Sequence, residues 1–393
     1  MNSILFWTSL LIIGYTFVGY PLLLFLLNLF FRSNDQTASH ATFTPQCTLI
    51  IPAFNEEQII DQKIKNTLSL EYPKDLLNII IVTDGSTDHT PAIAQKHKEV
   101  EVLHSPKRQG KTHAMLRAAY KSSSSIIIFS DANTMLSVNA IKELVIFFQD
   151  LQTGCVAGEK SIVHAPKARP IQASEGLYWR WEAFIKKQES RFHSTMGAAG
   201  ELFAIRRELI APLHEDTILD DFLLSMHVAG ERKRIRYTEK AVAQEAGSAS
   251  RKDEMERKTR IAAGAFQAVA RIKILKQPLR YPLQFWQLLS HKLLRWLFVP
   301  WMLVVLLVTN LMLVINQPNI TLYILLGVLQ LLFYALAIIS LPFQNRENQH
   351  AWLFFPGYFI LMNTAIILGA VRFFSKKQSA TWQRVQRGSG MLF

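Results

Sequence analysis

Acidic and amide side chains follow three short apolar runs of the sequence, at the point where each run ends. Such side chains could hold a nucleotide diphosphate, because carboxylate and amide oxygens bind divalent cations that in turn bind phosphate oxygens. A glycine followed by a basic residue, Gly110-Lys111, lies between the second and third clusters. The clusters are Pro52, Ala53, Phe54, Asn55 and Glu56 after the first run, Asp84 and Gly85 after the second, and Asp131 and Asn133 after the third.

The third cluster is the best candidate for a metal site. Asp131 and Asn133, two residues apart, offer hard oxygen donors of the kind that Mg²⁺ or Mn²⁺ prefers. Lys111 would add a positive charge for the phosphates. Each cluster also has a plain structural interpretation, since Asp-Gly-Ser suits a turn and Asp131 could simply cap a helix. The joint placement of all three at strand ends favours a ligand site.

Two further groups of charged residues lie later in the chain. Asp220 and Asp221 are adjacent, and neighbours on a helix diverge by about 100°, so we expect one to face a cleft and the other to pair elsewhere. We favour Asp221 as a general base. Arg257 and Arg260 are three residues apart and would share a helix face, where two guanidiniums could hold a diphosphate. A basic helix face lying over anionic lipids is the alternative.

The residues between 46 and 275 alternate short β-rich runs with helical stretches. Cys47–Ile51, Ile79–Val82 and Ile126–Phe129 have the composition of buried strands. This alternation predicts an α/β domain with a mainly parallel sheet covered by helices. In open sheets of this kind, ligands bind beyond the carboxyl ends of the strands, where the polar clusters stand.

Composition places this domain beside a membrane. The formal net charge is +13, yet half of the residues are hydrophobic. A basic surplus next to long apolar stretches favours a membrane surface and argues against nucleic acid as a partner. Only two cysteines are present, so a disulfide framework or a cysteine-rich zinc site is excluded.

Long apolar runs at both ends of the sequence predict transmembrane helices. Ile4–Phe31 carries no charge and suits a spanning helix better than a cleaved signal peptide, because it is too long for one and has no basic residues before it. Arg32 follows at once, which places the amino terminus outside and the middle of the chain in the cytosol. The runs Leu297–Ile315, Thr321–Leu341 and Trp352–Ala370 follow the central domain. The predicted organisation is a helix over 1–34, a cytosolic domain over 46–275, an interfacial segment over 281–296, membrane helices over 297–374 and a basic tail over 375–393.

Three carboxyl-terminal crossings would leave the basic tail outside, against the usual charge bias. Either the bias is broken, or one run, such as the one interrupted by Pro356 and Gly357, enters the bilayer and returns. We expect Tyr281–Trp296, with His291, Lys292 and Arg295 among aromatic residues, to lie in the headgroup layer. Leu177–Phe192 could do the same or could pack on the soluble domain.

As a set, these motifs resemble the family 2 glycosyltransferases, and more narrowly the membrane-embedded branch with the cellulose, chitin, hyaluronan and poly-N-acetylglucosamine synthases. The resemblance covers nearly the whole chain and implies a GT-A fold, the nucleotide-sugar-binding α/β fold. It implies that Pro52 to Glu56, Asp84 and Lys111 contact a UDP-sugar, that Asp131 begins the metal motif, and that Asp221 is the base. Gly197–Glu201 resembles the small-residue segment that lines the acceptor site.

Two positions depart from the family pattern. Asn133 replaces the second Asp of the metal motif, and Ile261 stands where the motif around Arg257 and Arg260 has Trp. In polymerising synthases that Trp stacks beneath the acceptor sugar. Its absence here argues against processive elongation.

We therefore predict an inverting, Mg²⁺- or Mn²⁺-dependent, UDP-sugar-using enzyme of the inner membrane that acts on a glycan or lipid-linked acceptor. Four spans are few for a secretion channel, so a homo-oligomer or an export partner is a further expectation. The alternatives are an inactive nucleotide-sugar-binding scaffold and a membrane transport protein. Because the apolar runs hold few charges for a solute pathway, transport is the weaker of the two.

Overall fold

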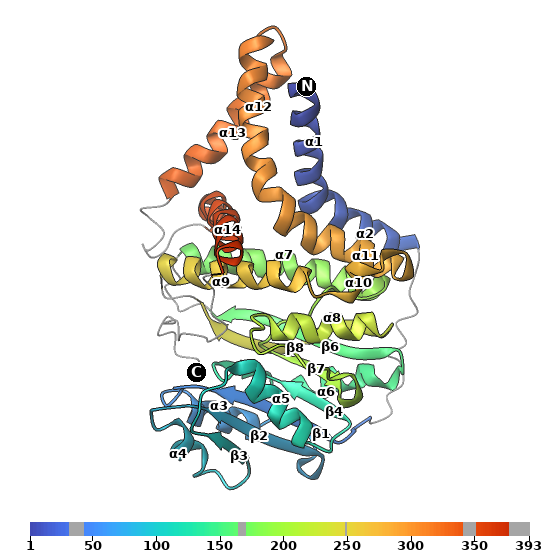
Figure 1. Cartoon of the computed structure of the whole chain (residues 1–393), viewed down its shortest axis with the longest axis vertical. Helices are drawn as coiled ribbons and strands as arrows, with labels where there is room; N and C mark the ends of the chain where they lie inside the picture. The colour runs from blue at the N-terminus through green and yellow to red at the C-terminus, as the bar shows by residue number, and fades with distance from the viewer. Residues whose placement is uncertain (31–42, 164–169, 248–249, 341–350, 377–393) are drawn as a thin grey trace.

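The computed structural model describes residues 1–30, 43–163, 170–247, 250–340 and 351–376. Predictions for Arg32 and for most of the basic tail therefore lie outside the described residues. Figure 1 shows three levels: an α/β domain, two long helices lying over it, and a group of apolar helices beyond those.

One eight-stranded sheet forms the centre of the α/β domain, in the order β3-β2-β1-β4-β7-β6-β8-β5. The first four strands are parallel, as the alternating sequence predicts, whereas β7 and β5 pair antiparallel with their neighbours and make the sheet mixed. The strands are β1 (Cys47–Ala53), β2 (Leu77–Asp84), β3 (Glu101–Ser105), β4 (Ile126–Phe129), β5 (Thr134–Leu136), β6 (Thr153–Val163), β7 (Phe203–Arg206) and β8 (Arg234–Ala246).

The alternation of side chains along β1 divides the core into two layers. Ile50 packs on the side of α5 and α8, while Leu49 and Ile51 pack on the side of α3, α4 and α6. All three are fully buried, because a central parallel strand is covered on both faces. These helices are α3 (Ile60–Leu68), α4 (Thr90–Ala94), α5 (Lys111–Lys121), α6 (Ala140–Val145) and α8 (Asp220–Gly230), with short 3-10 turns at Lys74–Leu76, Ile146–Gln149, Arg207–Leu209 and Pro278–Arg280.

Two long helices, α7 (Pro170–Phe192) and α9 (Arg251–Val269), separate the sheet from the apolar helices (Figure 1). Four helices are long and apolar enough to cross a membrane within the described chain: Asn2–Phe30, Pro282–Asn316, Thr321–Ser340 and Phe354–Phe374. Their parts are α1 (Asn2–Gly14), a π-helical turn (Tyr15–Gly19), α2 (Tyr20–Phe30), α11 (Pro282–Leu288), a π-helical stretch (Leu289–Phe298), α12 (Val299–Asn316), α13 (Thr321–Ser340) and α14 (Ala351–Phe374), with α10 (Lys273–Lys276) preceding α11.

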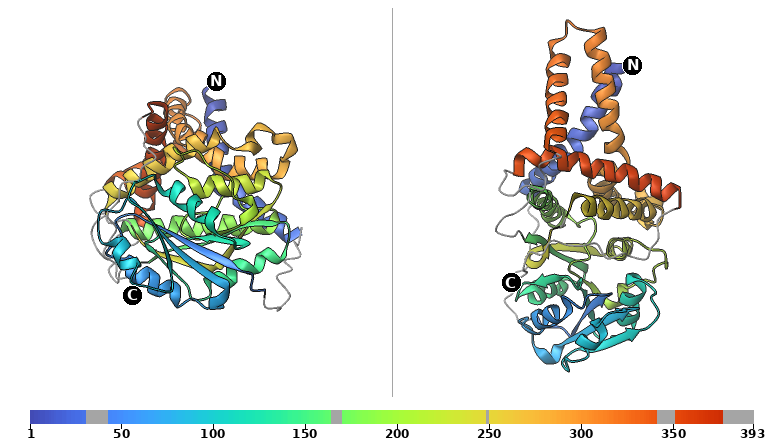
Figure 2. Two further views of the ribbon diagram at one scale, coloured as in Figure 1. Left: turned by 60° about the horizontal axis from the view of Figure 1, so that its bottom comes forward. Right: turned by 90° about the vertical axis from the view of Figure 1, so that its left-hand side faces the viewer.

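The last helix, α14, differs from the others in direction. Figure 2 shows α12 and α13 rising as an antiparallel pair, whereas α14 lies crosswise beneath them, over α9 and α7. Gly369 makes this contact possible, because a Cβ there would stand 2.5 Å from Ala262 Cβ and 2.9 Å from the Thr259 carbonyl oxygen. Half of the most apolar window of α14 is buried, against 11% for α13, so α14 is a covered helix.

The segment expected in the headgroup layer is instead the first part of one continuous helix, Pro282–Asn316. Its polar side chains face α7: Lys292 and Arg295 pair with Glu182 at 2.5 and 2.8 Å, and His291 contacts Glu189 at 3.0 Å. The expectation that these three side chains meet lipid headgroups is therefore wrong. Their charges have buried protein partners, which sequence spacing across a hundred residues could not reveal.

Candidate functional site

A cavity of about 1250 Å³ opens at the carboxyl ends of the parallel strands and extends past α9 to the membrane helices. The site residues predicted from distant parts of the sequence meet there, and only Asn55 and Gly85 lie outside its lining. Those that line it are Pro52, Ala53, Phe54, Glu56, Asp84, Lys111, Asp131, Asn133, Asp220, Asp221, Arg257 and Arg260.

Asp84, at the end of β2, holds the loop that leads into α5. Its carboxylate accepts hydrogen bonds from the backbone N–H groups of Gln109 at 2.9 Å and Gly110 at 2.6 Å. The next residue, Gly85, has a φ of +67°, and a Cβ there would come within 2.5 Å of Arg108. Glycine is required at this close approach, and Gly85 therefore shapes the turn without facing the cavity.

Asp131 and Lys111 form an ion pair at 2.6 Å in the cavity. Burial would lower the pKa of Lys111, but Asp131, Asp220 and Asp221 outweigh it and raise that pKa, so the ammonium stays charged. The turn that carries Asp131 is supported from below by the fully buried Lys63. Its ammonium donates to Ser130 Oγ and to the Thr134 carbonyl, each at 2.8 Å.

Asp220 and Asp221 both line the cavity, in contrast to the expectation that only one would. They occupy the first turn of α8, where Asp220 Oδ1 accepts the Asp221 backbone N–H at 2.9 Å. Burial and then repulsion from Asp220 raise the pKa of Asp221 to about 7, although Lys111 opposes the shift. An acid that titrates near neutral pH is suited to accept a proton from a hydroxyl.

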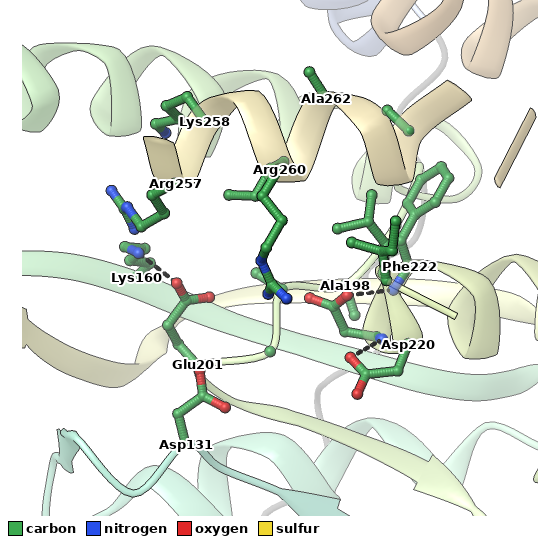
Figure 3. A pocket seen from close by; sticks show the side chains of 18 of the residues that line it. Asp131, Lys160, Ala198, Glu201, Asp220, Phe222, Arg257, Lys258, Arg260 and Ala262 are labelled. Carbon is green, nitrogen blue, oxygen red and sulfur yellow. Dashed lines mark hydrogen bonds and ion pairs between the residues drawn. The ribbon is translucent and has the colours of Figure 1, made fainter. Parts of the chain in front are cut away.

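The two arginines of α9 have different partners. Arg257 is held by Glu175 at 2.5 Å and by Glu254 at 2.8 Å. Figure 3 shows Arg260 pointing from α9 between Glu201 and Asp220, with Arg257 to one side above Lys160. Burial lowers the pKa of Arg260, an effect that Asp220, Asp221 and Asp131 oppose, and no described carboxylate lies within ion-pairing distance of it. Arg257 is therefore occupied by carboxylates, whereas Arg260 stays the predicted partner of a diphosphate.

A buried network that the sequence reasoning missed connects the metal motif to the small-residue segment. Lys160 of β6 pairs with Glu201 and, at 2.5 Å, with Glu245 of β8. Glu245 also accepts a hydrogen bond from Asn133 Nδ2 at 3.1 Å. The available signal was Lys160 itself, a charge inside the otherwise buried strand Thr153–Val163.

The small-residue segment Gly197–Glu201 lines the same cavity. Gly197 has a φ of +103° and packs against Phe222, so it needs glycine. A Cβ at Gly200 would stand 3.1 Å from Lys111 Nζ and 3.3 Å from Asp221 Oδ2. The missing side chain keeps space open beside the Asp221 carboxylate.

The donor set suits a cation that is bound jointly with a diphosphate. No group of three or more His, Cys, Asp or Glu side chains in the described chain could hold a metal by itself. Asp131 contributes a carboxylate, and Asn133 uses its Nδ2 on Glu245, which leaves the Oδ1 atom for a cation. Mg²⁺ is commonly held by one or two carboxylates together with substrate phosphates, so these residues fit.

Comparison with known proteins agrees with this geometry. Residues 48–213, which contain the three polar clusters and the small-residue segment, match the family model described as "Glycosyl transferase family 2". Residues 48–213 form a family 2 glycosyltransferase domain. The chain thus contains a glycosyltransferase domain of this type, which acts on a sugar donor, and its α/β fold with added membrane helices is the one that the motifs imply.

Two curated relatives differ in how much of their length matches this glycosyltransferase. "Probable glycosyltransferase YdaM" of Bacillus subtilis (strain 168) is 26% identical over 378 residues, which cover 87% of each chain. "Beta-monoglucosyldiacylglycerol synthase" of Nostoc sp. (strain PCC 7120 / SAG 25.82 / UTEX 2576) is 28% identical over 197 residues, 47% of this chain and 41% of that protein.

A solved structure shares the fold across almost the whole chain. "Mannosyltransferase PcManGT from Pyrobaculum calidifontis in complex with GDP-Man and Mn2+" superposes with a TM-score of 0.70 at 22% identity, covering 95% of this glycosyltransferase and all of that chain. The likeness therefore includes the membrane helices as well as the α/β domain.

Proposed function

We propose that this glycosyltransferase moves a hexosyl group from a UDP-sugar to a hydroxyl of a glycan or lipid-linked acceptor, with inversion, at the cytosolic face of the inner membrane. The observation that carries the proposal is the convergence of Asp221, Lys111, Asp131 and Arg260 on one cavity. A base, two cations and a metal-type carboxylate are the groups that transfer from a nucleotide sugar requires.

The reaction proposed is a direct displacement. The acceptor oxygen attacks the anomeric carbon, its proton passes to the Asp221 carboxylate, and the bond from that carbon to the diphosphate oxygen breaks. Because attack and departure occur on opposite faces of the sugar, an α-linked donor would give a β-linked product. Asp221 suits this role since its raised pKa, about 7, makes it a competent proton acceptor at neutral pH.

The departing diphosphate needs positive charge, which Lys111 and Arg260 would supply from the cavity lining. Asp131 and Asn133 would hold a Mg²⁺ or Mn²⁺ ion, which when bound neutralises charge on the diphosphate. Lys111 pairs with Asp131 Oδ1 at 2.6 Å, so its ammonium would stand beside the diphosphate oxygens next to the residues that would hold the ion.

UDP as the nucleotide follows from the resemblance of the strand-end motifs. The related solved structure contains GDP-Man, so the base is a matter for experiment. We expect UDP to displace a fluorescent nucleotide sugar from the purified protein in the presence of Mn²⁺ at lower concentrations than GDP does. Preferential displacement by GDP would contradict the choice of donor.

The membrane arrangement follows from α14. If Asn2–Phe30 crosses once and the α12–α13 pair crosses twice, the α/β domain and the start of α14 lie on one side. A crosswise α14 then stays on that side, and the basic tail remains in the cytosol, as the charge bias requires. This arrangement differs from both alternatives left open by the sequence, because α14 neither crosses the bilayer nor enters it and returns; we place it at the membrane surface.

Transfer assays with the full chain in nanodiscs test the function. With Mn²⁺, a UDP-sugar and native lipid extract, we expect the wild type to form a radiolabelled product. The Asp221→Asn variant should keep nucleotide binding and lose turnover at least about a thousandfold, the scale of losing a general base. Binding without turnover in the wild type would favour the inactive scaffold instead.

A further inference from the structure

An aromatic cluster lines the cavity on the side of the membrane helices. Phe17 lies 5.6 Å from Trp181 and 5.1 Å from Phe359, measured between ring centroids. Phe333 and Phe355 lie 5.8 and 6.4 Å from the same Phe359 ring. These five rings come from the first membrane helix, α7, α13 and α14, and all line the cavity that also contains Asp221.

The cluster extends to the outer surface of the membrane helices. Phe355 is 39% exposed, and α13, which carries Phe333, has exposed apolar residues such as Leu329 and Leu332. The cavity thus joins a reactive carboxylate at one end to a lipid-type surface at the other. An occupant that spans it must carry a hydroxyl at one end and apolar groups at the other.

Two of the polar groups beside the cluster are already bonded within the protein. Trp181 Nε1 donates to the Phe17 carbonyl at 3.3 Å, and the Tyr358 hydroxyl donates to Glu254 at 3.0 Å. A glycan chain in this part of the cavity would find few donors for its hydroxyls, and burying unpaired hydroxyls is costly. The lining therefore favours hydrocarbon over sugar.

Two cations near the cluster, Arg295 and Lys258, are also paired, which favours a neutral occupant over a lipid phosphate. Arg295, whose guanidinium lies 5.5 Å from the Trp181 ring, is bound by Glu182. Lys258, 5.3 Å from the Tyr178 ring, is paired with Glu254 at 3.6 Å. Among the buried lining atoms of the residues that the structure describes, Asn363 Oδ1 on α14 has no hydrogen-bond partner, and a hydroxyl could donate to it.

We propose that the acceptor is a single neutral membrane lipid with a free hydroxyl. Its chain lies among Phe17, Phe333 and Phe359 while its hydroxyl reaches Asp221. This inference rests on the proposed function and specifies its acceptor. In the step, the lipid oxygen bonds to the anomeric carbon, its proton goes to Asp221, and the nucleoside diphosphate leaves with the electrons of the broken bond.

The test blocks the apolar end without touching the acid end. Met362→Trp adds bulk to a residue of α14 that lines the cavity. Leu368→Trp is the matched control, since Leu368 lies on the same helix, is 43% exposed and is outside the lining. In phosphatidylcholine nanodiscs containing dioleoylglycerol, we expect Met362→Trp to lower transfer at least about tenfold and Leu368→Trp to stay near wild type. UDP binding with Mn²⁺ should be unchanged in both.

Three results would overturn the inference: Met362→Trp as active as wild type, transfer by the wild type only to polyprenyl phosphate, or transfer only to soluble oligosaccharides. Failure of the proposed function has a different signature, because the wild type would then neither bind UDP nor turn over with any acceptor.

If the Met362→Trp variant does not fold, photolabelling of the wild-type protein tests the proposal instead. Wild-type protein in nanodiscs that contain a diacylglycerol with a photoreactive chain should be labelled on α13 and α14 near Phe333 and Phe359, and excess dioleoylglycerol should reduce this labelling. Labelling confined to the exposed face of α13, without competition, would contradict the proposal.

Discussion

The two ends of the cavity are built in different ways. The acid end consists of loops that follow strands, and each loop carries its own chemistry in a few adjacent residues, such as Asp131 with Asn133 or Asp220 with Asp221. The aromatic end consists of five rings from four segments that lie far apart in the sequence. The comparison teaches that the candidate catalytic groups are encoded locally, whereas the proposed acceptor site depends on how the membrane helices assemble over the domain.

Helix α9 shows the same contrast within one turn. Arg257 faces the buried carboxylates of α7 and of its own helix, so it joins the two levels of the fold. Arg260 faces the acid end and keeps its guanidinium available. Two residues of one type, three positions apart, thus belong to the scaffold and to the candidate chemistry respectively.

Replacing these two arginines one at a time should give the largest difference, with one variant losing kcat and the other losing stability. Arg260→Ala removes a cation from the departing diphosphate, and we expect kcat to fall by about a hundredfold to a thousandfold with little change in thermal stability. Arg257→Ala removes the guanidinium that pairs with the buried Glu175 and Glu254 and should cost about 3 kcal/mol of unfolding free energy, seen as a lower Tm in detergent.

The contrast fails if Arg257→Ala loses turnover at unchanged Tm, or if Arg260→Ala is merely unstable. Arg260→Lys sharpens the result. Lysine keeps the positive charge but lacks the planar guanidinium group, so this variant should have only part of the wild-type kcat.

Disturbing the packing of α14 on α9 should have a smaller effect, which we expect on both stability and transfer. Gly369→Val would drive a side chain into Ala262 and the Thr259 carbonyl, and such overpacking costs about 1–3 kcal/mol. We expect a lower Tm and weaker transfer to lipid. Gly327→Val on α13 is the control, because its Cβ would meet nothing closer than 3.5 Å. Equal losses in both variants would mean that α14 does not need this contact.

The pH dependence gives the smallest effect. If Asp221 must be ionised, kcat/KM should rise with pH through an apparent pKa near 7. Asp220→Asn removes the like-charge repulsion, and the acidic limb should then move to lower pH by about one unit. A limb that stays in place would mean that burial alone raises the pKa of Asp221.

The same shift has a consequence for stability. The folded-state pKa of Asp221, about 7, lies above the ordinary value of 3.8, so the folded protein binds the proton more tightly than the unfolded chain does. The contribution of this group therefore favours the folded state at low pH, falls as the pH rises from about 4 to 7, and is lost above that window.

The predictable parts of the fold are those with a local signal. The runs that became β1, β2 and β4 and the apolar helices have clear periodicity or length, and the clusters behind the strands followed from sheet geometry. The antiparallel β7 and the partners of His291, Lys292 and Arg295 had no such signal, because each depends on a contact between distant segments.

By itself, the sequence determined which chemical groups stand at the strand ends and that apolar helices flank them, since strand composition, glycine placement and apolar length act over a few residues. Only the tertiary structure decided which arginine is free, that Asp220 and Asp221 share one cavity with Lys111, and that α14 lies crosswise with its rings beside the catalytic domain. The reason is physical: burial, ion pairing and pKa depend on neighbours brought together by packing, and packing is settled by the whole chain.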